Sequence, residues 1–130
     1  MDECEKQMKE QCLHIAQVLD GLAEGKWYDS TTGEILDEPL TDEDGDVDYG
    51  RCQDLYDYVM DNLGMKVLTD LQKETVYGVV ITFAWGGPGI YADTADGQVK
   101  GRWWGSSVDV PLLPETCDAI NEIVEEYWAL

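Results

Sequence analysis

Acidic side chains are concentrated in one segment of the chain, from Trp27 to Gly50, which contains no Lys or Arg. Clustered carboxylates can hold a divalent cation, exchange protons in catalysis, or pair with a positively charged surface. Each of these chemistries requires a different residue pattern, so the sequence can discriminate among them. The acidic residues of the segment are Asp29, Glu34, Asp37, Glu38, Asp42, Glu43, Asp44, Asp46 and Asp48.

The segment does not match the calcium-binding loop of an EF-hand. That loop has an acidic first position, Gly at the sixth position and Glu at the twelfth. With Gly45 placed sixth, Leu40 is first and Arg51 is twelfth. The sequence therefore predicts no specific metal site in this segment.

Recognisable catalytic and cofactor-binding motifs are also missing from the sequence. His14 is the only histidine and falls within a predicted helix, which does not favour a catalytic triad. The four cysteines are widely spaced without a Cys-x-x-Cys pair, which favours free, mostly buried thiols over a zinc site. Residues 86–89 lack the pattern of a phosphate-binding loop and predict a tight turn. We expect no enzymatic activity, no metal and no cofactor.

The chain as a whole is strongly negative: 28 Asp and Glu against 8 Lys and Arg give a formal net charge of −20. Direct binding to nucleic-acid phosphates or to anionic membranes requires the opposite sign, so we exclude both as partners. A hydrophobic fraction of 44% is typical of a folded domain and not of a disordered acidic tail. We therefore expect one acidic domain over residues 1–130. Charge repulsion favours a monomer.

The N-terminus lacks the basic and then apolar pattern of a secretion signal. No apolar stretch reaches the roughly 18–20 residues that a bilayer span needs. We therefore expect a cytoplasmic protein.

Residue periodicity predicts an α+β domain, in which amphipathic helices pack on one face of an antiparallel β-meander of three to four strands. A short hairpin is expected in the N-terminal half, over residues 26–36. The segment 65–73 is ambiguous, and we favour a loop or a short strand. Helices are predicted over 2–24, 50–64 and 114–128, a central strand over 75–85, and further strands over 90–93, 99–104 and 106–110.

An aromatic cluster accompanies the predicted meander and includes Trp85, Tyr91, Trp103 and Trp104. Sheet packing is the favoured interpretation. Two alternatives remain open: an exposed aromatic anchor in a protein interface, and a stacking platform for a sugar or nucleotide.

The spacing of the acidic residues matches that of nucleic-acid phosphates. In an extended backbone, residues 42, 44, 46 and 48 would lie on one side about 6.6 Å apart, close to twice the 3.4 Å charge repeat of a DNA strand. Two predicted helices add acidic stripes with repeats of about 5 Å and above. These stripes are Asp54, Asp57 and Asp61, and Glu115, Asp118, Glu122 and Glu125.

Small size, strong acidity, an α+β pattern and the acidic run from Asp42 to Asp48 together resemble the DNA-mimicking inhibitors encoded by phages and mobile elements. These include anti-CRISPR and anti-restriction proteins. The resemblance covers the whole chain in size and charge and includes no signature motif. It implies an inhibitor that occupies the basic nucleic-acid channel of a defence nuclease, with a CRISPR effector as the first candidate.

Charge density and this resemblance lead us to expect a partner interface made of carboxylates. The alternative is a small accessory domain that binds its partner through the Trp-rich sheet. The first predicted contact residues are Asp37, Glu38, Asp42, Glu43, Asp44, Asp46 and Asp48, and the second set is Glu115, Asp118 and Glu122.

Overall fold

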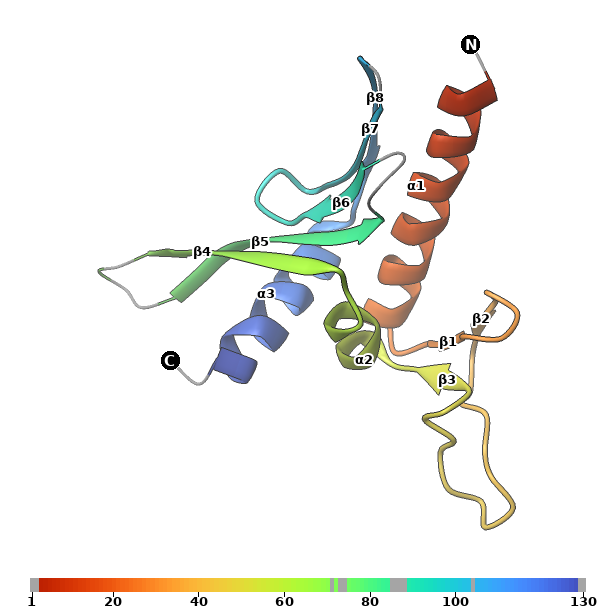
Figure 1. Cartoon of the computed structure of the whole chain (residues 1–130). Coiled ribbons are helices and arrows are strands. Elements are labelled where there is room, and N and C mark those ends of the chain that lie inside the picture. Colours follow the sequence, from red (N-terminus) through yellow and green to blue (C-terminus); the bar gives the residue numbers. More distant parts are fainter. Residues whose placement is uncertain (1–2, 71, 73–74, 85–88, 104, 129–130) are drawn as a thin grey trace.

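The computed structural model describes residues 3–70, 72, 75–84, 89–103 and 105–128, with Cys4 and Trp128 described by their backbone only. Within these residues, three helices accompany two antiparallel sheets, so the predicted α+β class is confirmed (Figure 1). In chain order the elements are α1 (Glu3–Ala23), β1 (Trp27–Asp29), β2 (Ile35–Leu36), β3 (Cys52–Gln53), α2 (Leu55–Met60), β4 (Gly64–Asp70), β5 (Thr75–Ala84), β6 (Gly89–Asp93), β7 (Gln98–Trp103), β8 (Ser106–Pro111) and α3 (Pro114–Trp128).

Helix α1 forms almost over its predicted range because its apolar residues recur on one side. Met8, Cys12 and Leu19 are fully buried. Gly21 lies inside the helix because β2 approaches closely there: a Cβ at this position would be 3.2 Å from Cγ2 of Ile35. None of the helices in the described ranges combines the length and the apolar character needed to cross a bilayer.

The larger sheet has the strand order β4-β5-β6-β7-β8, so each strand pairs with its neighbour in sequence. This is the predicted antiparallel meander, but with five strands instead of three to four. The additional strand is β4, where a loop or short strand was expected. Each residue of β4 is half-buried or exposed, as befits an edge strand, and its alternation of apolar and polar residues is correspondingly weak.

The core lies against one face of this sheet. Directly paired residues share a face in an antiparallel sheet, and the pairs Ile81↔Ala92 and Ala92↔Val99 are fully buried. Helix α1 contributes Met8 and Cys12 to this core, and α3 contributes Ile120 and Val124.

A buried hydroxyl connects α3 to the sheet. Thr94 Oγ1 accepts the N–H of Val79 at 2.8 Å and donates to Oδ1 of Asn121 at 2.6 Å. Thr94 therefore satisfies a buried backbone donor that would otherwise be unpaired.

The second helix is much shorter than the predicted range 50–64. Cys52 and Gln53 instead form β3, which pairs with β1. Asp54 then caps α2, because its Oδ1 accepts the N–H of Asp57 at 2.9 Å. Gly64, the last residue of the predicted helix, instead begins β4.

The predicted N-terminal hairpin is confirmed by the pairs Trp27↔Leu36 and Tyr28↔Ile35. Gly33 has a positive φ of 79°, which suits a residue in the hairpin turn. Strand β3 adds a third strand on the other edge of β1, and this small sheet supports the most acidic part of the chain.

Candidate functional site

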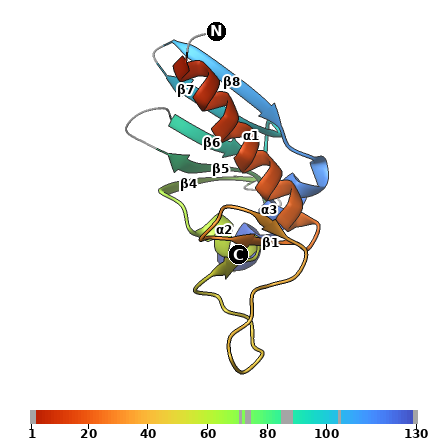
Figure 2. The ribbon, with the colours of Figure 1, turned by 90° about the vertical axis from the view of Figure 1, so that its right-hand side faces the viewer.

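The acidic loop, residues 37–51, connects β2 to β3 and projects away from the rest of the molecule (Figures 1 and 2). Both strands pair with β1, so the two ends of the loop are anchored on the same small sheet. The loop contains the whole first set of predicted contact residues: Asp37, Glu38, Asp42, Glu43, Asp44, Asp46 and Asp48.

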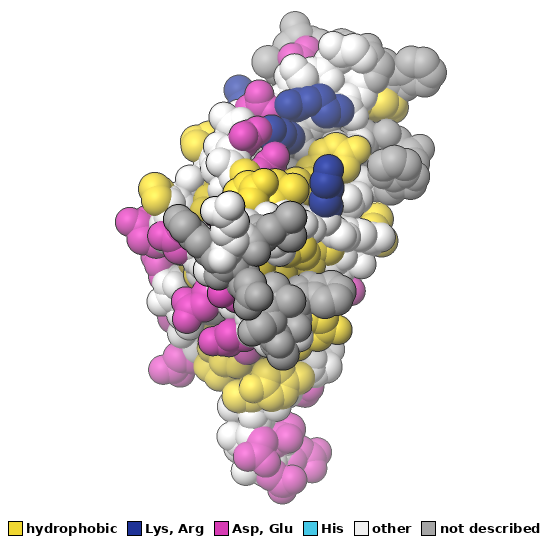
Figure 3. All heavy atoms as spheres, turned by 90° about the vertical axis from the view of Figure 1, so that its left-hand side faces the viewer, with side chains coloured by type: hydrophobic (Ala, Val, Ile, Leu, Met, Phe, Trp, Pro, Cys, Tyr) yellow, Lys and Arg dark blue, Asp and Glu magenta, His cyan; other side chains and the backbone are white. Residues whose placement is uncertain are grey.

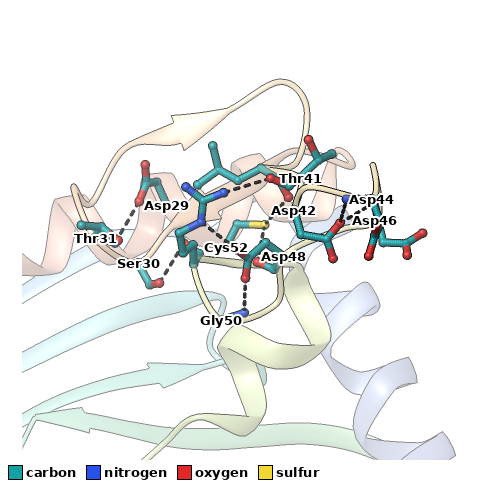
Figure 4. Close-up of polar contacts among 12 residues, drawn as sticks. Asp29, Ser30, Thr31, Thr41, Asp42, Asp44, Asp46, Asp48, Gly50 and Cys52 are labelled. Carbon is teal, nitrogen blue, oxygen red and sulfur yellow. Dashed lines mark hydrogen bonds and ion pairs between the residues drawn. The ribbon is translucent and has the colours of Figure 1, made fainter.

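The tip of the acidic loop is a tight turn organised by Asp42. Its Oδ1 accepts the backbone N–H groups of Asp44 at 2.9 Å and Asp46 at 3.0 Å (Figure 4). The N–H of Asp42 also donates to the carbonyl of Asp46 at 2.8 Å, and Gly45 has a φ of 85°. The predicted extended row of alternating carboxylates is therefore wrong, because the short Asp42 side chain and Gly45 together favour a reversal of the chain.

The base of the acidic loop is held by Arg51. Its Nε donates to Oδ2 of Asp48 at 2.8 Å, and its Nη2 donates to the carbonyl of Thr41 at 2.9 Å (Figure 4). Arg51 thus connects the two strands of the loop. No motif in the sequence predicts this role, although the first basic residue after a long acidic run is a natural internal partner for one of those acids.

The hydrogen bond from Arg51 is the main reason that the pKa of Asp48 lies below its ordinary value of 3.8. The backbone N–H of Gly50, 3.0 Å from Oδ1 of Asp48, adds to this effect. Asp48 therefore supports the loop, and its carboxylate is already partnered within the chain.

Asp29 has a similar internal role in the turn of the β1–β2 hairpin. Its Oδ1 accepts the N–H of Thr31 at 2.8 Å and that of Thr32 at 3.2 Å, and these bonds, led by the one from Thr31, lower its pKa. The neighbouring Ser30 donates to the carbonyl of Arg51 at 2.9 Å. The hairpin turn is thereby attached to the base of the acidic loop.

Three carboxylates at the loop tip are directed to solvent. Glu43, Asp44 and Asp46 are exposed, and within the described part of the chain their side chains have no hydrogen bond or ion pair. Figure 3 shows the resulting acidic cluster at the end of the molecule, well away from the Lys and Arg side chains on the same view. These three residues are the best placed of the first set to contact a partner.

The second predicted set lies elsewhere on the molecule. Glu115, Asp118 and Glu122 are exposed residues of α3, and the acidic loop projects away from that helix (Figures 1 and 2). The two sets therefore do not form one continuous surface.

The acidic stripe predicted on the second helix is not an outward row. Asp54 is the N-cap of α2, and both Asp54 and Asp57 are half-buried. The pKa of Asp57 lies above its ordinary value, mainly because the group is partly buried and secondly because the negative charge of Asp54 is near. Only Asp61 of this stripe is exposed.

Two basic residues on the outer face of the meander, Lys100 and Arg102, are paired with acids. Lys100 contacts Asp93 at 3.4 Å and also Asp96, while Arg102 lies 3.0 Å from Asp109. These pairs reduce the positive charge that this face could offer to nucleic acid.

The aromatic platform is only partly within the described residues. Trp103 is half-buried and packs against the hydrophobic core, and Tyr91 is half-buried in β6. Trp85, Trp104 and the predicted turn at 86–88 lie outside the described residues, so a role of this cluster in a partner interface stays a prediction.

The cysteines within the described side chains are free and buried, as predicted: Cys12, Cys52 and Cys117. Burial raises the pKa of the Cys12 thiol to about 11 and also raises that of Cys117, which disfavours the reactive thiolate. The side chain of Cys4 lies outside the described residues. Across the described residues, no three His, Cys, Asp or Glu side chains are grouped in a metal-binding arrangement.

No family model, curated protein or solved structure matches this chain. The carboxylates of the acidic loop divide into two kinds, those that hold the loop, such as Asp42 and Asp48, and those that face solvent, such as Glu43, Asp44 and Asp46.

Acidification should loosen the base of the acidic loop. Because the folded-state pKa of Asp48 is below 3.8, its pairing with Arg51 stabilises the fold above that pH and is lost as the pH falls through the folded pKa. Amide hydrogen exchange at Gly50 and Cys52 should therefore accelerate below about pH 4, after correction for intrinsic exchange rates. Asp48→Asn should give the fast pattern at neutral pH, whereas exchange as slow as in the parent chain would contradict this role.

Proposed function

We propose that the protein is a non-enzymatic inhibitor that binds the basic nucleic-acid channel of a defence nuclease, with carboxylates in the place of DNA phosphates. A CRISPR effector nuclease is the first candidate partner, and the setting is the cytoplasm of a host cell infected by a phage or carrying a mobile element. The observation that carries the proposal is the projecting acidic loop with outward Glu43, Asp44 and Asp46 on a chain of net charge −20.

Electrostatics supports this choice of partner. A strongly negative surface is steered toward positive surfaces and repelled from nucleic acid itself. The twenty net charges correspond to about 34 Å of duplex DNA, at one charge per about 1.7 Å of its axis. A folded domain of this length is about 36 Å across, so its average charge per unit length is similar to that of the duplex.

The shape of the loop indicates which kind of basic site on the nuclease it would bind. A compact tip presents its carboxylates over a short distance, unlike the long row of phosphates in a strand. Such a tip suits a confined basic site, and the place where arginines of a CRISPR nuclease read the short PAM duplex is one. We therefore propose insertion of the tip into such a site in preference to alignment along the whole channel.

A competition experiment tests this function directly. A guide-loaded Cas9-type nuclease is incubated with a labelled PAM-containing duplex at low salt, and the protein is added in increasing amounts. We expect displacement of the duplex and weaker displacement as salt is raised. Absence of displacement at a large molar excess would remove this nuclease as the partner.

A pull-down from bacterial lysate at low salt, eluted with a salt gradient, extends the test to other nucleases. Recovery of a basic nuclease that elutes with salt supports the proposal. If binding is insensitive to salt and is lost in Trp103→Ala, the accessory domain with a Trp-rich interface becomes the better explanation.

A further inference from the structure

A cavity of about 540 Å³, open to solvent, is lined by residues of α1, β1, α2, β5 and β6. This volume falls within the range of roughly 300–1,000 Å³ that is common for ligand sites. Five elements supply its walls, so it forms only when the small sheet, α2 and the meander are assembled around α1. Its characteristic side chains are Glu10, His14, Tyr28, Tyr58 and Phe83.

Three aromatic rings make up one side of the cavity. The ring centroids of Tyr28 and Tyr58 are 5.1 Å apart with an interplanar angle of 65°, so the two rings form walls that meet at a steep angle. Phe83 stacks on Tyr58 at 5.5 Å and 29°. Because the rings come from β1, α2 and β5 and also contact the core, they are held in place before any ligand arrives.

The polar lining comes from α1, as Glu10, Gln11 and His14, and the rest of the lining is apolar: Ile15, Ala84 and Ile90. Glu10 and His14 are exposed, and Glu10 is the acidic residue among those that line the cavity. His14 contacts Tyr28, with their ring centroids 6.3 Å apart. Burial is the main cause that raises the pKa of Tyr58 far above its ordinary value, so its hydroxyl is neutral. The negative charge in the lining of the cavity therefore comes from the carboxylate of Glu10.

The turn of the β1–β2 hairpin lies beside the cavity. A Cβ on Gly33 would be 3.8 Å from Oη of Tyr28 and 3.9 Å from Nε2 of His14. The same hairpin connects to the base of the acidic loop through Ser30 and Arg51. The hairpin therefore connects the wall of this cavity to the base of the acidic loop.

We propose that this cavity binds the guanidinium group of an arginine side chain. The negative faces of aromatic rings attract cations, and the planar guanidinium stacks on such rings while its methylene stem contacts apolar walls. Glu10 offers an oxygen acceptor pair for the fork of N–H donors. The net charge of −20 raises the local concentration of cations and opposes the entry of anions.

The arginine can come from either of two sources, the basic partner or a free arginine derivative. The first source rests on the proposed function, because it requires a basic protein surface next to the acidic loop. Both sources share the same chemistry, so one probe tests the cavity and a second measurement separates the sources.

The probe is N-acetyl-arginine methylamide, titrated into the ¹⁵N-labelled protein and followed by NMR. We expect saturable shifts, with a Kd in the millimolar range, for residues around Glu10, Tyr28 and Tyr58. The matched neutral probe is N-acetyl-citrulline methylamide, which has a similar shape without the charge. Equal binding of the two probes, or shifts confined to the acidic loop, would overturn the proposal.

Two variants assign the binding to the cavity. Glu10→Gln should weaken binding of the arginine probe about threefold or more, because an exposed ion pair is lost. Tyr28→Leu should weaken it further, because one aromatic wall is removed. Glu3→Gln makes the same charge change on α1 outside the cavity and should leave the Kd unchanged. If Glu10→Gln, an exposed change that preserves the fold, has no more effect than Glu3→Gln, the assignment is wrong.

The partner experiment separates the two sources. If Tyr28→Leu and Glu10→Gln weaken displacement of the duplex from the nuclease, the arginine belongs to the partner. If the cavity binds the probe and displacement is unchanged, the source is a free arginine derivative. Displacement without probe binding would refute the cavity proposal and leave the proposed function intact. Probe binding without displacement by the parent chain would support the cavity proposal and remove this nuclease as the partner.

Discussion

Replacing Glu43, Asp44 and Asp46 together by Gln, Asn and Asn should weaken partner binding about tenfold at low salt. Each exposed charge pair contributes about 0.5 kcal/mol to the binding free energy, so three pairs contribute about 1.5 kcal/mol, which corresponds to about tenfold in Kd. The salt dependence of binding should also become smaller, because fewer carboxylates face the basic surface. The measurement is the displacement of a labelled duplex from the nuclease, repeated over a series of salt concentrations.

This choice of residues follows from the loop geometry. Asp42 and Asp48 are also acidic, but Asp42 holds the tip and Asp48 pairs with Arg51. Their replacement would change the shape of the loop along with its charge, and the two effects could not be separated. The outward residues change charge while the internal hydrogen bonds of the loop remain.

The second predicted set provides a matched control. Glu115→Gln, Asp118→Asn and Glu122→Gln change the net charge of the chain by the same amount, on exposed positions of α3. If the acidic loop is the contact, this triple variant should lose much less affinity than the loop variant. Equal losses would show that total charge decides binding, and an unchanged affinity and salt slope in the loop variant would reject the loop as the contact.

Much of the fold could be predicted from local patterns in the sequence. Helices α1 and α3 have apolar residues at helical spacing over several turns, and β5 is a long run rich in β-branched residues. The turn between β6 and β7 has a local signal as well, because Asp96 is followed by Gly97, which has a φ of 69°. In these elements the local preference and the tertiary environment favour the same structure.

The predictions that were wrong concern short segments whose structure depends on distant partners. Cys52 and Leu55 fit a helical period, yet Cys52 pairs with Asp29 across the small sheet, and only the residues after Asp54 form a helix. Strand β4 has no fully buried residue and is stabilised by its ladder with β5. A local pattern does not contain this information.

In the candidate site, too, one property could be predicted from the local sequence and another could not. Its location could be predicted, because a long run of acids without a base cannot be buried and must lie on the surface. Its geometry could not, because alternate Asp residues are compatible both with an extended strand and with a turn. The decisive contacts were the side-chain to backbone bonds of Asp42 and the pairing of Asp48 with Arg51.

Replacing Gly101 by Ala should destabilise the chain by about 1–3 kcal/mol, the usual cost of overpacking a core. A Cβ at this position of β7 would lie 2.7 Å from Cγ of Met8 and 2.9 Å from Sγ of Cys12, so these side chains, or α1 with them, would have to shift. The free energy of unfolding, measured by urea denaturation, reports the loss. Gly64→Ala is the matched control in β4, where the nearest atom, Oγ1 of Thr82, is 3.9 Å away, and it should have little effect.

A second variant distinguishes steric crowding from any other effect of the added methyl group. Shortening Met8 to Ala removes two of the three nearest atoms that the new Cβ would meet, Cγ and Sδ of Met8, at the cost of a cavity in the core. The double variant Met8→Ala with Gly101→Ala should therefore be more stable than the sum of the two single losses indicates. Strict additivity, or a Gly101→Ala protein as stable as the parent chain, would show that α1 does not pack against β7 at this distance. Such a result would also remove the support for the cavity, whose polar side is formed by the same helix.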